Sequence, residues 1–369
     1  MDTTKNLKVL IAAGGTGGHL FPALALVEEL QILLNGHLVP IFVGNGEKIE
    51  SRVIPKLGYQ FHKIPVRGFN GIFQLNTLTL PVKIFNSILK CRSLIRKHKI
   101  DACVCAGAYI SYPAGIAAHQ ERIPLILMES NVFPGKTNRL LSEKATAIFT
   151  AFEESERYFS QPIKKKIKYL GNPIRQALAK LPNQEEARAK FNLEPKKKTI
   201  LVFGGSLGAR SINQAIEKII PNFADSGIQF LWQTGTNYQL PQSLPEYVTP
   251  LTFINDMASA YSAADLVIAR SGATTVTELC VVGKPSILIP LPTAANNEQE
   301  LNASILEEKK AAVMLPDESL NDELEAVIRN VISDKKLLSW MGKIAKSIAK
   351  PDAAKKSAEE LMKIINEFH

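Results

Sequence analysis

The sequence predicts an α/β protein built from two doubly wound, Rossmann-like domains. In the first half of the 369-residue chain, short apolar runs alternate with helical patterns, which is the rhythm of βαβ units around a parallel sheet. The rhythm starts again near residue 199 with a glycine-rich turn of its own, and the chain is longer than one hydrophobic core comfortably fills. We therefore expect a first domain over residues 1–172, a second over 173–351, and a C-terminal helix over 352–369.

The individual elements follow from hydrophobic period and flanking glycine or proline. Strands are expected over residues 8–13, 38–43, 61–64, 102–105, 125–128, 199–203, 229–233, 251–253, 266–269 and 286–289. Helices are expected from Pro22, which suits a first helical turn, over 47–57, through 212–219 and over 352–368. Because ligands bind at the carboxyl ends of parallel strands, the loops after these strands form the candidate site.

The charge of the chain is unevenly distributed. Residues 1–175 carry 23 Lys/Arg against 12 Asp/Glu, whereas the remainder carries 21 against 23. A basic first domain suits nucleic acid, an anionic membrane or a phosphorylated substrate about equally.

We find no signal-peptide pattern and no apolar run of about 18 residues, so we expect neither secretion nor a membrane span. The cysteines lack metal-site spacing and are expected to pack as small apolar side chains in a reducing cytosol: Cys91, Cys103, Cys105 and Cys280.

The loop Gly14-Gly15-Thr16-Gly17-Gly18-His19 follows the first strand and is expected to bind a phosphate or sugar phosphate through its amides. It is no dinucleotide fingerprint, because Leu20 stands where the third glycine belongs and the next strand ends in Gly44 rather than an acidic residue. A simple tight turn is the alternative. His19 could take a proton from a hydroxyl nucleophile, although a histidine at a helix start is more often structural.

Two further glycine turns, over residues 204–210 and 270–278, lie in the second domain. Each precedes a helix whose first-turn amides would point at an anion. Glu278 could hydrogen-bond both hydroxyls of a ribose, but Thr275 and Glu278 also form a capping-box pattern that would only satisfy the helix start. Both interpretations stay open at this point.

Tyr109, Glu129 and Asn131 follow strands of the first domain, where they are either ligand contacts or loop-fixing groups. The chain has no Asp-x-Asp pair and its six histidines are scattered, so we expect no bound metal. The charge of a diphosphate would then be offset by helix N-termini, backbone amides and a cation such as Arg175.

Residues 69–99 mix many apolar side chains with lysine and arginine, as in segments that lie on an anionic membrane surface. The alternative is an ordinary helix that is buried on one side and basic on the other. Aromatic residues are not interleaved with the cations as base stacking requires, so no nucleic acid is expected. The side chains that would meet the membrane are Phe73, Leu75, Lys83, Phe85, Lys90 and Arg92.

Five stretches of the sequence together resemble the MurG family of N-acetylglucosaminyltransferases, in glycosyltransferase family 28. They are GGTGGHLFPALAL at 14–26, GNPIR at 171–175, GGSLGAR at 204–210, the segment 253–279 and EQELNA at 298–303. The resemblance implies a GT-B fold, in which two Rossmann-like domains face each other across a cleft and the C-terminal helix packs back onto the first domain. It also implies inverting transfer of N-acetylglucosamine from UDP-GlcNAc to the C4 hydroxyl of undecaprenyl-pyrophosphoryl-MurNAc-pentapeptide (lipid I), which yields lipid II.

The resemblance further implies a role in peptidoglycan and cell wall synthesis, and so in cell shape and division. It implies a peripheral protein on an anionic membrane surface, at the cytoplasmic face of the bacterial inner membrane, with no cofactor. In the second domain it assigns Ile254 to the uracil, Glu278 to the ribose, and Ser206 with the turn Gly272, Ala273, Thr274, Thr275, Val276 and Thr277 to the diphosphate. Its remaining donor contacts are Arg175, Gln299, Asn302, Thr16, Gly17, Gly18 and Asn131. Gly14, Gly15, Tyr109 and Glu129 are expected on the acceptor side, and His19 is the candidate general base.

Four positions depart from the family's usual pattern, and they leave the acceptor and sugar contacts open: Ala108, Tyr112, Ser130 and Glu298. Two other functions remain as alternatives. A UDP-sugar 2-epimerase on the same fold would need added carboxylates around the sugar ring. A non-catalytic module that binds a UDP-sugar and a membrane would tolerate the loss of His19.

Overall fold

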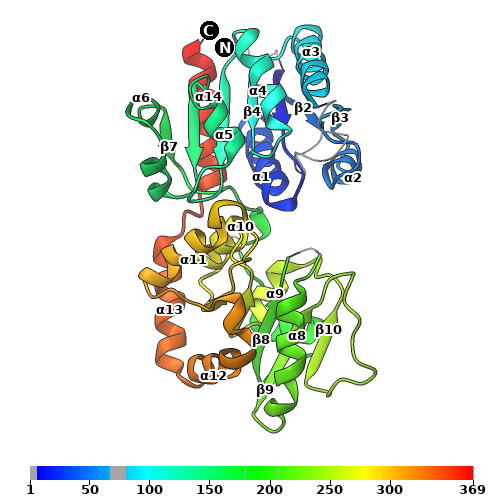
Figure 1. The fold of residues 1–369 in the computed structure, drawn as a ribbon, viewed down its shortest axis with the longest axis vertical. Coiled ribbons are helices and arrows are strands. Elements are labelled where there is room, and N and C mark those ends of the chain that lie inside the picture. The colour runs from blue at the N-terminus through cyan, green and yellow to red at the C-terminus, as the bar shows by residue number, and fades with distance from the viewer. Residues whose placement is uncertain (1–5, 67–79, 179, 206, 369) are drawn as a thin grey trace. The chain divides into compact units, whose positions relative to one another are not determined.

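The computed structural model describes residues 6–66, 80–178, 180–205 and 207–368. The chain divides into two compact units, which Figure 1 shows in one view. Unit 1 holds Met1–Arg175 and Pro351–His369, and unit 2 holds Gln176–Lys350. Arg175, which the predicted boundary put in the second domain, is therefore the last residue of unit 1 before the chain enters unit 2.

Unit 1 contains a seven-stranded sheet in the order β3-β2-β1-β4-β5-β6-β7, and its described strand pairs are all parallel. The strand order reverses between β1 and β4, so the crevice at their carboxyl ends is where a doubly wound sheet binds ligands. The strands are β1 (Leu7–Ala12), β2 (Leu38–Gly44), β3 (Gln60–Lys63), β4 (Ala102–Cys105), β5 (Leu125–Glu129), β6 (Ala147–Thr150) and β7 (Ile167–Tyr169). The last two were not predicted.

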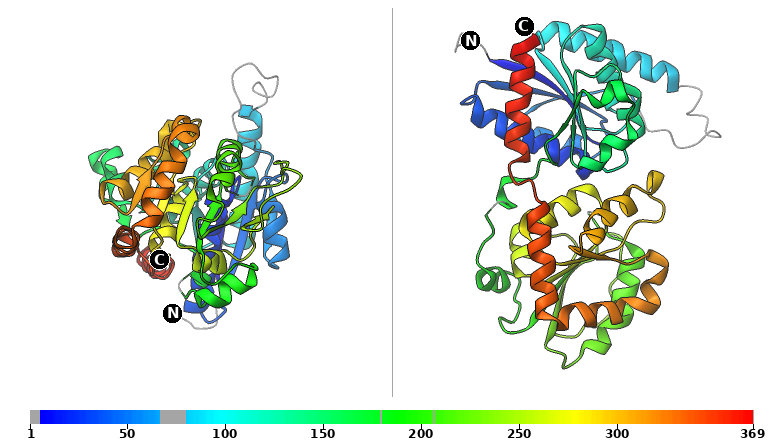
Figure 2. Two further views of the ribbon diagram at one scale, coloured as in Figure 1. Left: turned by 90° about the horizontal axis from the view of Figure 1, so that it is seen from below. Right: turned by 90° about the vertical axis from the view of Figure 1, so that its left-hand side faces the viewer.

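Helices cover both faces of this sheet. Side chains of α1, α2 and α14 share one buried apolar cluster with one face, and those of α3, α4 and α5 share another with the opposite face. Figure 2 shows α14, in red, lying along the sheet of unit 1. The helices are α1 (Gly17–Leu33), α2 (Glu50–Lys56), α3 (Leu80–His98), α4 (Ser111–Gln120), α5 (Lys136–Leu141), η2 (Glu153–Tyr158), α6 (Gln161–Lys164) and α14 (Ala353–Phe368).

The predicted start of α1 was wrong. The helix begins at Gly17, so Pro22 lies inside it rather than in its first turn. Thr16 is the N-cap in an extended conformation, and its carbonyl accepts the N–H groups of His19 and Leu20. The glycines after Thr16 therefore belong to the helix, and this brings His19 into its first turn. Helix α2 is also shorter than predicted, because a turn occupies the residues before Glu50.

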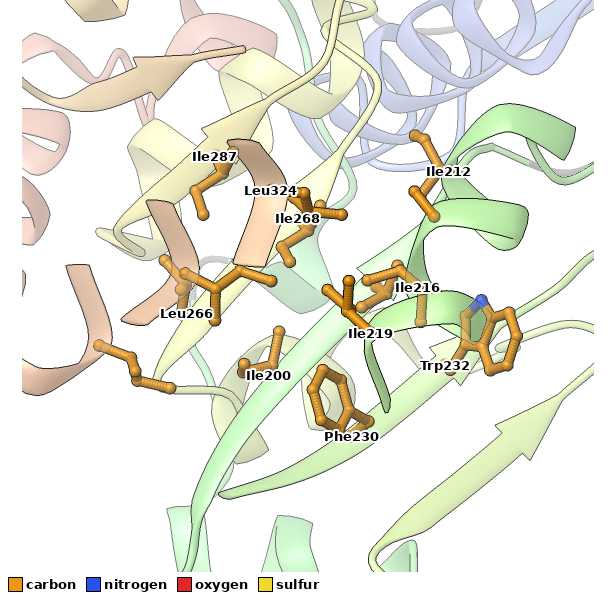
Figure 3. Close-up of a cluster of buried hydrophobic side chains, with 14 of the residues drawn as sticks. Ile200, Ile212, Ile216, Ile219, Phe230, Trp232, Leu266, Ile268, Ile287 and Leu324 are labelled. Atoms are coloured by element: carbon orange, nitrogen blue, oxygen red, sulfur yellow. The ribbon is translucent and has the colours of Figure 1, made fainter. Parts of the chain in front are cut away.

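Unit 2 contains a six-stranded sheet in the order β10-β9-β8-β11-β12-β13, again with parallel described pairs. Its order reverses between β8 and β11. Figure 3 shows strand residues such as Ile200 and Leu266 packed with Ile216 of α8 and Leu324 of α12. The strands are β8 (Lys198–Phe203), β9 (Ile228–Gln233), β10 (Val248–Leu251), β11 (Leu266–Ala269), β12 (Ser286–Leu288) and β13 (Ala312–Met314).

The strand predicted at residues 251–253 lies earlier in the chain than expected: β10 begins at Val248 and ends at Leu251. Pro250 lies within β10, which is an edge strand, where proline is tolerated. The helices of unit 2 are η3 (Gln176–Leu178), α7 (Gln184–Lys190), α8 (Arg210–Ile219), η4 (Ile220–Phe223), α9 (Met257–Ala263), α10 (Ala273–Val282), η5 (Ala295–Asn297), α11 (Glu298–Glu308), η6 (Asp317–Ser319), α12 (Leu320–Ser333) and α13 (Lys335–Ile348).

The four cysteines are free and buried, which confirms that they pack as small apolar side chains. Among the described helices, none combines the length and the apolar character that crossing a membrane requires.

Candidate active site

His19 stands at the carboxyl ends of β1 and β4, where the order of the unit 1 sheet reverses. Its Nδ1 lies 3.1 Å from the hydroxyl oxygen of Thr16. The other edge of the ring faces Gly107, where an added Cβ would come within 2.7 Å of His19 Cδ2 and 3.0 Å of Nε2. Gly107 also has a φ of +94°, so glycine is required there on two counts. The loop after β4 is thus fitted closely against the imidazole.

Burial lowers the pKa of His19 to about 4, because a charged imidazolium loses hydration in this position. As a whole residue His19 is only half-buried, and solvent screening works against the shift. A pKa below the ordinary value of about 6.5 keeps the imidazole neutral at neutral pH. In the tautomer whose Nδ1–H donates to the Thr16 hydroxyl, Nε2 of the neutral ring carries the lone pair that can accept a proton.

Glu129 is a loop-fixing residue, one of the two alternatives that the sequence left open. One carboxylate oxygen accepts the N–H of Asn131 at 2.9 Å, and the other accepts the N–H of Gly135 and the side-chain amide of Asn138, both at 2.8 Å. The backbone carbonyl of Asn131 in turn accepts the hydroxyl of Ser155. Glu129 therefore shapes the loop after β5, and Asn131 is placed by it.

The departures from the family pattern have local structural consequences. Ala108 has a φ of +59°, a conformation that costs a residue with a Cβ roughly 1–2 kcal/mol relative to glycine. It immediately precedes Tyr109, which is half-buried. Ser130 is buried and its hydroxyl donates to Asn172 at 3.1 Å. Tyr112 packs on the α3–α4 side of the sheet.

In unit 2, the turn after β11 leads into α10, and Gly272 is its N-cap. Thr275 is consequently the third residue of the helix, and the capping-box interpretation of Thr275 and Glu278 is wrong because a capping box needs Thr275 at the N-cap. Glu278 is only 6% exposed, and its carboxylate accepts the hydroxyl of Tyr261 at 2.8 Å. This acidic group therefore has a buried partner and a fixed position beside the turn.

A second side chain that the sequence did not reveal connects the other loops of unit 2. Gln233, at the end of β9, donates to the carbonyl of Gly205 at 2.9 Å and accepts the N–H of Ile254 at 2.8 Å. The Ile254 N–H is thus occupied by Gln233. Ser206 lies outside the described residues.

The turn 270–278 is anchored from both sides. Arg270 donates to Asp317 at 2.5 Å, to the carbonyl of Pro290 at 2.9 Å and to the Ser211 hydroxyl at 2.7 Å. Asn302 of α11 donates its side-chain amide to the carbonyl of Ser271 at 3.3 Å. The turn is therefore held rigidly, with the first-turn amides of α10, from Ala273 to Thr275, at its end.

Three other residues predicted to contact the donor have side chains that bond or pack within the protein itself. The Thr277 hydroxyl donates to the carbonyl of Ala273 inside the helix, and Val276 is buried. The Gln299 side-chain carbonyl accepts the N–H of Leu291 at 3.1 Å. Burial raises the pKa of the neighbouring Glu298.

The predicted donor residues fall into two groups by unit. Ile254, the turn from Gly272 to Glu278, Gln299 and Asn302 lie in unit 2. Unit 1 holds Thr16, Gly17, Gly18, Asn131 and Arg175. The Arg175 guanidinium lies 5.1 Å from the centroid of the Phe21 ring, a cation–π contact that ties it to α1.

Helix α3 has a buried face and, separately, an exposed apolar stripe. Cys91, Leu94 and Ile95 pack inward. Val82, Phe85 and Leu89 are 60%, 59% and 44% exposed and follow one another at helical spacing on the outer surface. Residues 51–100 contain ten Lys/Arg and no Asp/Glu. The buried face is that of an ordinary helix packed on one side, and contact of the exposed stripe with a membrane stays a prediction. Phe73 and Leu75 lie outside the described residues.

Within the described part of the chain, no group of three or more His, Cys, Asp and Glu side chains is placed to hold a metal ion.

Comparisons with known proteins cover nearly the whole chain. Residues 9–150 match the glycosyltransferase family 28 N-terminal domain, and residues 199–357 match the glycosyltransferase family 28 C-terminal domain. A protein of Christiangramia forsetii named UDP-N-acetylglucosamine–N-acetylmuramyl-(pentapeptide) pyrophosphoryl-undecaprenol N-acetylglucosamine transferase is 37% identical over 370 residues, which is 98% of this chain and 99% of that protein. A protein of the same name from Parabacteroides distasonis is 37% identical over 369 residues, again 98% and 99%.

Solved structures with a similar fold include a member of the same family. The crystal structure of Acinetobacter baumannii MurG has a TM-score of 0.75 at 27% identity and covers 97% of this chain and 99% of its own. A UDP-GlcNAc 2-epimerase from Neisseria meningitidis has a TM-score of 0.68, covering 97% of this chain and 100% of its own, but at 15% identity it indicates a shared fold alone. By its identity to these relatives over almost its entire length, the chain belongs to the MurG family of N-acetylglucosaminyltransferases, within glycosyltransferase family 28.

Proposed function

We propose that this chain transfers N-acetylglucosamine from UDP-N-acetylglucosamine to the C4 hydroxyl of undecaprenyl-pyrophosphoryl-N-acetylmuramoyl-pentapeptide. The names of its relatives state this donor, this acceptor and this reaction. The observation that carries the proposal is the turn before α10: it follows β11 at the reversal of the unit 2 sheet, it forms the N-terminus of the helix, and the same helix carries the buried carboxylate of Glu278. That combination suits a ribose next to a diphosphate.

The proposed chemistry divides between the two units. Unit 2 binds the donor, with Glu278 at the ribose, the Ile254 carbonyl at the uracil and the amides of α10 at the diphosphate. Unit 1 presents His19, whose neutral ring takes the proton of the attacking C4 hydroxyl. As the anomeric carbon is attacked, negative charge moves onto the UDP leaving group, and the helix N-terminus stabilises that charge.

An assay with UDP-N-acetylglucosamine and a lipid-linked muramoyl-pentapeptide analogue tests this function. We expect release of UDP that depends on the acceptor, together with a disaccharide product. Isomerisation of UDP-N-acetylglucosamine without acceptor would identify a 2-epimerase instead. Binding of the donor with no turnover would identify a non-catalytic module.

The transfer is expected to need no divalent metal, because amides of α10 and the Arg175 guanidinium supply the charge that offsets the diphosphate. Adding excess EDTA to the assay should leave the initial rate within about two-fold of its value without chelator, since no metal-held charge would be lost. A rate that collapses in EDTA and returns with Mg²⁺ or Mn²⁺ would contradict this metal-independent scheme.

We further propose that α3 docks unit 1 on the cytoplasmic face of the membrane. Its exposed apolar stripe, Val82, Phe85 and Leu89, would enter the headgroup region while nearby lysines meet anionic lipids. Arg92 has another partner, because its Nε donates to Glu121 at 2.7 Å. Arg96 and Arg92 together lower the pKa of that carboxyl.

Reversing Lys83, Lys90 and Lys97 to glutamate should weaken binding to phosphatidylglycerol vesicles more than a hundred-fold, at about 1 kcal/mol for each cation near the surface. Turnover of a water-soluble acceptor analogue should stay unchanged, and co-sedimentation measures the binding. Arg92 is left intact because its reversal would place two carboxylates together. The matched control reverses three exposed lysines of α13: Lys336, Lys343 and Lys346. Equal losses in both variants would refute docking through α3.

A further inference from the structure

Glu50 is a fully buried carboxylate at the rim of the unit 1 sheet, and no motif in the sequence marks it. It lies in the first turn of α2 with no exposed surface. Its Oε2 accepts the N–H of Gly15 at 2.9 Å, and its Oε1 accepts the N–H of Asn45 at 2.9 Å. One side chain therefore joins the loop after β1 to the loop after β2.

The network extends to a third strand. The side-chain amide of Asn45 donates to the carbonyl of Val66 at 3.0 Å, in the segment that follows β3. The side-chain carbonyl of Asn45 accepts the N–H of Glu47 at 2.8 Å, which fixes the turn before α2. Glu50 and Asn45 thus link the carboxyl ends of three neighbouring strands.

Two glycines leave room for this carboxylate. A Cβ on Gly14 would lie 2.3 Å from the carboxylate carbon of Glu50, and a Cβ on Gly44 would lie 2.6 Å from its Cγ. Such distances are far inside van der Waals contact. The sequence suggested that the first glycine loop binds a phosphate. In the structure, the missing side chain of Gly14 leaves the space that the Glu50 carboxylate fills.

From these contacts we infer that Glu50 is a positioning residue, which holds the first glycine loop in the conformation that presents His19 to the acceptor. The inference rests on the proposed transferase function. The Gly15 amide is committed to Glu50, so it donates no hydrogen bond to a substrate. A carboxylate that accepts backbone N–H groups makes charge-assisted hydrogen bonds, which are stronger than those of a neutral amide. It therefore fixes the path of the chain just before Thr16 and His19.

Glu50→Gln is the test, because it keeps the size of the side chain but removes the charge and turns one acceptor into a donor. That donor would face an N–H group, so the Gly15 or the Asn45 hydrogen bond must break. We expect kcat/KM for the acceptor to fall about ten- to a hundred-fold, as small misplacements of catalytic groups do. The KM for UDP-N-acetylglucosamine should stay within about two-fold, because its main contacts lie in unit 2. Glu143→Gln, at an exposed position of unit 1 outside this network, should match the wild type.

Amide hydrogen exchange provides a readout that does not depend on turnover. The Gly15 and Asn45 amides should exchange at least ten-fold faster in Glu50→Gln, and the β5 amides should be unchanged. Glu50→Asp, which is charged but shorter, should recover part of the activity and of the protection. If wild-type protein fails to transfer the sugar, the function is wrong, while the exchange still tests the contact.

Unchanged acceptor kinetics in Glu50→Gln would overturn the positioning role. So would an equal loss of donor affinity together with a large drop in melting temperature, because that result would describe general destabilisation.

Discussion

Replacing His19 by alanine is expected to lower kcat about a hundred-fold or more, while the KM for UDP-N-acetylglucosamine changes only a few-fold, as the loss of a general base does. The imidazole is held between Thr16 and Gly107 at the reversal point of the unit 1 sheet, so its loss removes a placed proton acceptor. Initial rates at saturating donor and acceptor measure the effect. His119→Ala, on an exposed position of α4, is the matched control and should retain full activity.

The pH profile of the wild type gives a second measurement on His19. A base acts in its deprotonated form, so activity is lost only as the pH falls through the pKa of the free enzyme. With an ordinary pKa near 6.5, kcat/KM would fall about ten-fold between pH 7.5 and 5.5. Because burial lowers the pKa of His19 to about 4, we expect a much smaller loss over that range. A full acid limb at pH 6.5 that disappears in His19→Ala would show that burial does not depress this pKa. Turnover unchanged in the variant would assign the proton to another acceptor.

The features of the site that could be predicted from the sequence are those that depend on neighbouring residues in the chain. Glycine turns after apolar runs located the carboxyl ends of β1 in the unit 1 sheet and of β8 and β11 in the unit 2 sheet, since parallel strands within one sheet end at the same edge. The short strands β6, β7 and β13 were missed, because three or four residues show no measurable period.

The missed residues act across longer separations. Glu50 reaches Gly15 over 35 positions, Gln233 reaches Ile254 over 21, and Tyr261 reaches Glu278 over 17. A sequence gives no sign of such pairs, because the contacts depend on which strands become neighbours. Each of these side chains binds a loop that the sequence did identify. Buried polar side chains therefore determine where the glycine loops lie.

Helix α10 carries Glu278, the residue proposed to bind the ribose of the donor. Its N-cap is Gly272, which removes the capping role from Glu278, and the buried carboxylate of Glu278 accepts the hydroxyl of Tyr261. A carboxylate can accept several hydrogen bonds, so one from Tyr261 orients the group without exhausting it. The same contact would also be made if Glu278 were purely structural. A substitution must therefore distinguish ligand binding from stability.

Glu278→Gln is expected to raise the Kd for UDP about ten- to a hundred-fold, because hydrogen bonds to a charged acceptor are worth about 1.5–3 kcal/mol and the amide accepts more weakly. Tyr261→Phe serves as the control: it removes the hydroxyl that orients Glu278 but keeps the carboxylate, so the affinity should fall less. The sharper measurement compares UDP with 2′-deoxy-UDP by calorimetry in both proteins. If the carboxylate binds the ribose, removing the 2′-hydroxyl weakens binding to the wild type and changes little in Glu278→Gln, since the two changes delete one interaction. If both proteins lose the same factor, Glu278 does not bind that hydroxyl. A lower melting temperature with unchanged UDP affinity would leave Glu278 as the buried partner of Tyr261 alone.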